Sequence, residues 1–179
     1  LLDKGTIDRV DSFQNSLKGD ATIKDAAGYT RALDLMLGAL ETGSGVGDIQ
    51  LLKMLARLQD PDSVVREAEY NTLAQAIPFF DLVGIKLEGI FTGQKLNDVG
   101  RKKILDLAVT AYHDRRSEID RIVNAVVDTE LALPGGSGRA DLFQLASERF
   151  RVPALHSGRL DRAYNKLNEG IKLLEEGQG

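Results

Sequence analysis

The sequence predicts an all-α protein, an irregular multi-helix bundle with one long helix and no strands. Apolar residues recur at steps of three and four along most of the chain, which is typical of amphipathic helices. No window sustains the alternation of apolar and polar residues that marks a half-buried strand. Stretches rich in Gly and Pro separate the periodic segments, and 179 residues are enough to bury a sizeable core.

The first half of the chain predicts three helices, over residues 3–17, 23–40 and 49–58. Asp20 or Thr22 is placed to cap the second helix, and Asp48 to cap the third, because short polar side chains accept hydrogen bonds from the free N–H groups of a first turn. Two further helices follow, over 61–77 and 79–91, with Asp60 as cap and Pro61 at the first helical position. Pro78 separates them.

The longest predicted element runs from Val99 to about Leu133, opened by Asn97 or Asp98. Alternating steps of four and three from Leu105 to Leu133 give nine positions, of which all but Arg116 and Glu130 are apolar. Its middle, residues 113–121, is almost entirely charged, so we expect an exposed mid-section. A helix of about 50 Å exceeds what one compact domain of this size needs, and such helices commonly pack against partners.

A Gly-rich stretch, residues 134–138, reads as the clearest linker in the chain. It divides the chain into a helical bundle core with the long helix, residues 1–133, and a C-terminal helical pair, residues 139–176. The pair consists of helices over 139–150 and 159–176, separated at Pro153.

Composition limits the function classes. The formal net charge of −4 lacks the basic excess expected of a general nucleic-acid binder, so direct contact with nucleic acid is not indicated and stays open. No apolar run is long enough to span a bilayer. The absence of cysteine excludes disulfides and thiolate chemistry.

Candidate catalytic and metal-ligating groups all have a simpler structural interpretation. The glycine runs 43–47 and 135–138 follow no predicted strand, as a phosphate-binding loop requires, and are better explained as connectors. Asp60 and Asp62 suit a helix start, while Glu67 and Glu69 point to different helix faces. His113 and His156 have no second His or Cys ligand at helical spacing. We therefore predict no enzyme activity, no cofactor and no metal.

Charged residues on predicted helices are better candidates for an interface. Arg115, Arg116 and Arg121 are interleaved with acidic residues on the long helix, a pattern typical of a salt-bridged exposed or interface surface. The full predicted set of interface residues is Arg66, Glu67, Glu69, Tyr70, Arg115, Arg116 and Arg121.

Part of the chain resembles a known family. Gly47–Ile49 (GDI), Leu58–Tyr70 (LQDPDSVVREAEY) and a G-x-x-L step at Gly93–Leu96, followed by a long helix, are similar to a helical region of tailed-bacteriophage virion proteins. That family includes internal (ejection) and tail-associated proteins. The resemblance covers about a third of the chain, from Gly47 to Val109, and departs at Pro78-Phe-Phe, where a more polar stretch is expected.

The resemblance implies a structural component of a phage virion, in the tail or the DNA-ejection conduit used in host entry. It implies helix-mediated assembly of the chain with further copies of itself, as a homo-oligomer, and with other virion proteins. The particles would be assembled in the host cytoplasm. The chain begins at Leu1 and ends in Gly-Gln-Gly, so we expect a processed product or a piece of a longer polypeptide.

Two alternatives stay open. One is a peptidoglycan-cleaving lytic domain of a virion protein, in which Glu67, Glu69 or Glu88 would be the acid. The other is a non-phage helical adaptor or regulator that binds a partner helix.

Overall fold

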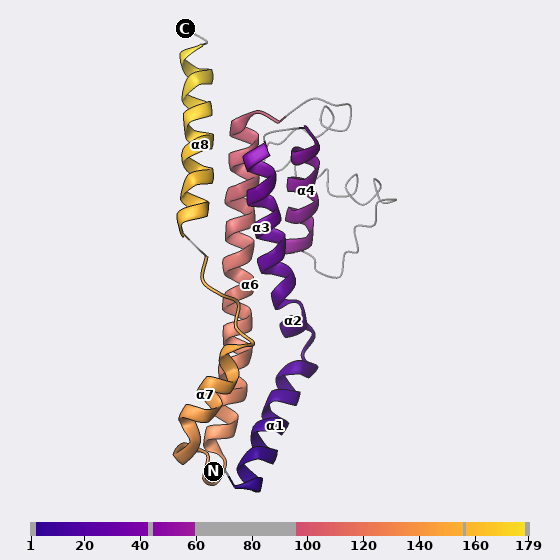
Figure 1. Ribbon diagram of the computed structural model, residues 1–179, viewed down its shortest axis with the longest axis vertical. Helices are drawn as coiled ribbons and strands as arrows, with labels where there is room; N and C mark the ends of the chain where they lie inside the picture. Colours follow the sequence, from indigo (N-terminus) through magenta and orange to yellow (C-terminus); the bar gives the residue numbers. More distant parts are fainter. Residues whose placement is uncertain (1–2, 43–44, 60–95, 156, 178–179) are drawn as a thin grey trace, which may run out of the picture. The chain divides into compact units, whose positions relative to one another are not determined.

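The computed structural model of the chain describes residues 3–42, 45–59, 96–155 and 157–177. Every element in these ranges is a helix and none is a strand, which confirms the predicted all-α class with one long helix. The predicted helices 61–77 and 79–91 lie outside the described residues. The elements, drawn in Figure 1, are α1 (Lys4–Gly19), α2 (Ala21–Lys24), α3 (Ala26–Thr42), α4 (Gly45–Gln59), α6 (Asp98–Ala132), the 3-10 helix η1 (Ser137–Arg139), α7 (Ala140–Glu148) and α8 (Ser157–Glu176).

Aspartates set the helix starts in the first third of the chain. Asp3 caps α1. The Asp20 side chain accepts a hydrogen bond from the Ile23 N–H and so caps α2, and of the two predicted caps, Asp20 and Thr22, it is therefore Asp20 that acts. The predicted helix 23–40 is divided, because Asp25 ends α2 and its backbone carbonyl accepts the Gly28 and Tyr29 N–H groups at the start of α3.

Packing divides the chain into two units, each built from segments far apart in sequence. Unit 1 comprises Leu1–Thr30 and His113–Pro153, and unit 2 comprises Arg31–Tyr112 and Ala154–Gly179. Helices α3 and α6 therefore contribute residues to both units, α7 belongs to unit 1, and α8 belongs to unit 2. This grouping differs from the predicted segments 1–133 and 139–176, whose behaviour as domains stays a prediction.

The core of unit 1 is apolar and aromatic. Phe13 of α1 and Phe143 of α7 are fully buried and meet edge to face, with ring centroids 5.3 Å apart. Ile119, Val123 and Val127 of α6 are buried in the same unit. Burial of these side chains is the main force that holds α1, α6 and α7 together.

A tight turn links α6 to α7 within unit 1. Gly135 has φ +76°, and the Gly136 N–H donates to the Leu133 carbonyl. A Cβ at Gly136 would lie 2.1 Å from the Glu130 carbonyl oxygen, so only glycine fits there. The Arg9 guanidinium adds hydrogen bonds to the carbonyls of Glu130 and Pro134. Within the Gly-rich stretch predicted as a linker, Gly136 is therefore tightly packed against the end of α6, whereas Gly135 and Gly138 have nothing within 4 Å of a Cβ position.

Unit 2 has an aliphatic core from α3, α4 and the first part of α6. Its fully buried side chains include Met36, Leu51, Leu52, Leu55, Leu58, Ile104 and Leu105. Leu105 lies on the apolar stripe predicted for the long helix, whereas the neighbouring Ile104 does not.

The predicted apolar stripe of α6 is buried at Leu105, Tyr112, Ile119 and Val123. Toward the C-terminus the burial shifts by one residue, because Val127 is buried and Leu133, just past the helix end, is 46% exposed. A straight helix with 3.6 residues per turn drifts away from a strict 3.5-residue repeat, which explains the shift.

Candidate functional site

Four of the seven predicted interface residues, Arg66, Glu67, Glu69 and Tyr70, lie outside the described residues, as does the third candidate acid, Glu88. The other three, Arg115, Arg116 and Arg121, lie on α6 in unit 1. The structure therefore bears only on the charged mid-section of the long helix.

This mid-section is partly packed within unit 1. The Arg115 guanidinium lies over the Tyr29 ring, 5.9 Å from its centroid, and pairs with Glu118 at 3.0 Å. Arg116 is half-buried with its Nε 3.9 Å from Asp120, whereas Arg121 is exposed. The expected exposed mid-section is confirmed in part, because Arg115 and Arg116 are half-buried and Ile119 is buried. The exposed residues of the mid-section are His113, Asp114, Ser117 and Arg121.

A further arginine, which the sequence did not single out, also binds this helix. Arg151, just after α7, donates to Asp120 at 3.0 Å and to Asn124 at 2.7 Å. The Asp120 carboxylate thus forms ion pairs with both Arg116 and Arg151. These contacts use the interleaved acidic residues inside unit 1.

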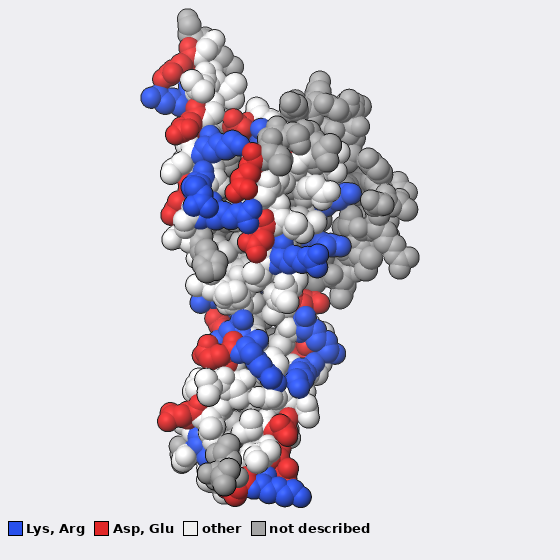
Figure 2. All heavy atoms as spheres, viewed as in Figure 1, with Lys and Arg blue, Asp and Glu red and all other residues white. Residues whose placement is uncertain are grey.

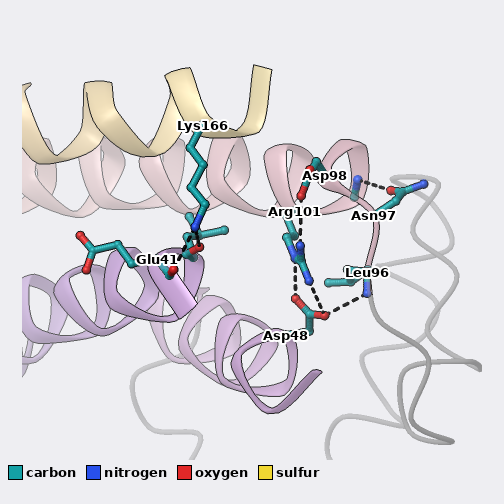
Figure 3. A network of polar contacts seen from close by, with 9 residues as sticks. Glu41, Asp48, Leu96, Asn97, Asp98, Arg101 and Lys166 are labelled. Carbon is teal, nitrogen blue, oxygen red and sulfur yellow. Dashed lines mark hydrogen bonds and ion pairs between the residues drawn. The ribbon is translucent and has the colours of Figure 1, made fainter. Parts of the chain in front are cut away.

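Among the described residues, the most deeply buried charged side chain is Asp48, in unit 2. Asp48 is only 1% exposed and lies in the first turn of α4, which begins three residues earlier at Gly45. Its predicted role as N-cap is therefore wrong. Instead, Oδ2 accepts the Leu96 N–H at 2.9 Å, and both oxygens accept hydrogen bonds from Arg101, at 2.7 and 3.0 Å (Figure 3).

Arg101 completes the network at the start of α6. It also donates to Asp98 at 3.0 Å, and the neighbouring Asn97 caps the helix by accepting the Gly100 N–H. The hydrogen bond to Asp48 raises the pKa of Arg101, so the guanidinium stays charged. The prediction that Asn97 or Asp98 opens this helix is confirmed. The network joins α4 to the first turn of α6, and its chemistry is that of a fixed structural ion pair.

A second polar contact area in unit 2 holds α8. The Lys166 ammonium donates to the carbonyls of Leu40 and Glu41 in the last turn of α3, at 3.3 and 2.9 Å (Figure 3). The last carbonyls of a helix have no N–H partner within the helix, so the ammonium supplies their missing hydrogen bonds. Its positive charge also complements the negative end of the α3 dipole. Arg159 pairs with Glu41 at 3.3 Å and with Asp34 at 3.8 Å.

Tyr164 fastens the middle of α8 to α6. Its hydroxyl donates to Asp106 at 2.8 Å, and Lys102 lies 5.6 Å from its ring centroid. The pKa of Tyr164 is raised, chiefly because the phenol is partly buried and also because it donates a hydrogen bond to Asp106. Farther along, a Cβ at Gly170 would lie 1.9 Å from an Asp98 carboxylate oxygen, so a residue without a side chain permits this close approach.

The surface charges are mixed. On the face shown in Figure 2, blue Lys and Arg side chains stand beside red Asp and Glu side chains. Across the described ranges, no group of three His, Cys, Asp or Glu side chains could hold a metal ion. None of the helices searched there is long and apolar enough to cross a membrane. The strongest features are therefore contact surfaces, above all the site that binds α8.

Compared with protein-family models, with curated proteins and with solved structures, the chain matches none.

Proposed function

We propose that the chain is a helical structural component of a tailed-phage virion, part of the tail or the DNA-ejection conduit. The observation that carries the proposal is the resemblance of the Asp60–Tyr70 run, DPDSVVREAEY, to a helical region of such virion proteins. The all-α architecture with a helix of 35 residues supports it, because the resemblance implies long helices.

Helix-mediated assembly is the mechanism that this proposal requires. In the last turns of α8, Leu174 is exposed and extends the apolar stripe beyond the buried Leu167, and Leu173, on another face of the helix, is 68% exposed. Leu145 of α7 is 74% exposed. Exposed apolar side chains on helices become buried when copies or other virion proteins pack against them. The chain would then act as an assembly part of the particle, put together in the host cytoplasm, and not as an enzyme.

Mass spectrometry of purified particles tests this proposal. Particles from infected cells are banded by density, washed at high salt and digested, and peptides of the chain are counted against an abundant non-virion protein from the same lysate. We expect peptides of the chain to stay with the particles in several copies each. A chain that is abundant in the lysate and absent from washed particles would overturn the proposal.

A further inference from the structure

Helix α8 is joined to the rest of the described chain differently from every other part of unit 2. The chain passes between the units at three places: Thr30/Arg31, Tyr112/His113 and Pro153/Ala154. The first two lie inside α3 and α6, whereas the third lies in the non-helical stretch 152–155. A change of backbone direction there breaks no helix.

The stretch before α8 favours an extended tether. Pro153 has a fixed φ and lacks an N–H, and the residue before a proline is biased toward extended conformations. Val152 is buried in unit 1, which anchors the start of the tether, while Pro153 and Ala154 are exposed. Such a tether can lead α8 away from its own chain.

The contacts of α8 resemble those of a separable surface. Its buried residues are Ala163 and Leu167. Leu160 and Ile171 are only half-buried, and the hydrogen bonds and ion pairs from Arg159, Tyr164 and Lys166 are at partly exposed atoms. Interfaces that form between already folded parts are similarly polar.

The surface that receives α8, here called the α8 site, is specific. It consists of Asp34, Glu41, Asp98, Asp106 and the carbonyl of Leu40. Its carboxylates complement the basic Arg159 and Lys166, and the close approach of Gly170 to Asp98 fixes where along α6 the helix lies. A site so matched to α8 fits the same helix of any copy of the chain.

We propose that α8 is exchanged between copies, so that the α8 of one copy occupies the α8 site of another. Every contact described above is then kept, and only the stretch 152–155 changes its path, which makes exchange an inexpensive route to assembly. Reciprocal exchange yields a closed pair, and head-to-tail exchange yields a ring or a filament. The inference deepens the proposed function, since it rests on helix-mediated assembly and names the partner as a second copy.

A disulfide across the α8 site provides the test, because the natural chain has no cysteine. The Cβ positions of Asp98 and Gly170 lie 3.4 Å apart, close to the roughly 3.5–4.5 Å found in disulfides. We expect the full-length double variant Asp98→Cys/Gly170→Cys, once oxidised, to run on a non-reducing gel as covalent pairs or ladders that collapse with reductant. The matched control Asp98→Cys/Asn168→Cys places the second thiol on an exposed residue of α8 and reports random cross-linking.

An oxidised double variant that stays a single chain, with both thiols consumed, would overturn the exchange. Sedimentation velocity of the unmodified chain provides a reading that does not depend on the cysteines. We expect the mass of two or more chains, and the mass of one chain at every concentration would also overturn the exchange. If the chain is found in particles but its α8 binds the α8 site of the same chain, only the exchange is wrong. If α8 is exchanged but the chain is absent from particles, only the proposed function is wrong.

Discussion

The two C-terminal helices are held by different forces. In unit 1, the nine-residue α7 places Phe143 wholly inside the core, against Phe13. In unit 2, the 20-residue α8 buries Ala163 and Leu167 and relies on Arg159, Tyr164 and Lys166 for most of its named contacts. The shorter helix is therefore the one more firmly integrated into its unit.

The difference teaches that the kind of contact determines how readily a helix separates. An apolar core residue loses its whole stabilisation when it is exposed, whereas partly exposed hydrogen bonds are readily replaced by water. Helix α7 should then separate only when unit 1 unfolds, and α8 should separate while unit 2 stays folded. Five variants or conditions test this contrast.

Phe143→Ala should have the largest effect. Removing a fully buried aromatic ring leaves a cavity beside Phe13, and we expect the free energy of unfolding to fall by about 3–5 kcal/mol. Urea denaturation followed by circular dichroism measures the loss. The matched control is Leu145→Ala on the same helix, which should change stability by less than about 0.5 kcal/mol. Equal losses for both variants would contradict the proposed core role of α7.

Asp48→Asn tests whether polar contacts become strong once they are buried. Removing one partner of a buried pair leaves the Arg101 charge poorly compensated, and we expect a loss of about 3 kcal/mol. Combining it with Arg101→Met should restore part of the loss, since no buried charge is then left unpaired. If Asp48→Asn alone lowers the free energy of unfolding by less than about 1 kcal/mol, this buried ion pair contributes no more stability than an exposed one.

Gly136→Ala should destabilise unit 1 by more than about 1 kcal/mol, because its Cβ would overlap the Glu130 carbonyl. Gly138→Ala is the matched control in the same turn, since nothing lies within 4 Å of its Cβ position. Thermal unfolding of the two variants side by side provides the measurement. A turn that tolerates both substitutions equally would be a flexible linker after all.

Lys166→Met should release α8 without unfolding unit 2. The substitution keeps the apolar stem and removes the hydrogen bonds to the Leu40 and Glu41 carbonyls, which weakens docking by about 1 kcal/mol. Hydrogen exchange should then speed up in α8 and stay unchanged in α4. Lys172→Met serves as the control, since Lys172 is on the same helix and its ion pair is with Glu176 four residues along it. Faster exchange throughout unit 2 would show that α8 is not a separable element.

Acid should have the smallest effect, and on α8 it should act through Glu41. The hydrogen bond from Arg159 holds the pKa of Glu41 below its ordinary value of 4.5, so this stabilisation is complete above that pH. It is lost as the pH falls through the lower pKa of the folded chain. Hydrogen exchange in α8, corrected for the intrinsic rate, should therefore increase on acidification below pH 4.5, and Glu41→Gln should remove this dependence. An unchanged pH profile in that variant would exclude Glu41 as the cause.

The helices were predictable because their signals are local. Apolar spacing located α1, α3, α4, α6 and α8 to within a few residues, and the caps at Asp20 and Asn97 follow from side-chain chemistry alone. The division at Asp25 was missed, because it depends on one backbone geometry inside an otherwise periodic segment.

The contact sites were not predictable because they join distant segments. Asp48 looks like a cap in the sequence, and only Leu96 and Arg101, about 50 residues away, reveal it as a buried ion-pair partner. Likewise, Lys166 looks like an ordinary surface charge until the carbonyls at the end of α3 are placed beside it. The candidate interface residues Arg66, Glu67, Glu69 and Tyr70 stay predictions.

The distance in sequence between partners has a consequence for synthesis of the chain. Phe13 and Arg9 leave the ribosome before Phe143 and Glu130, which complete unit 1 and are made more than a hundred residues later. At about 5–20 residues per second, the apolar surface of α1 waits on the order of 10 s for its partner. Unit 2 waits in the same way for α8. A nascent chain with this order of contacts exposes its first helices to chaperones and to neighbouring nascent chains, so copies made on one message meet while their α8 sites are still empty.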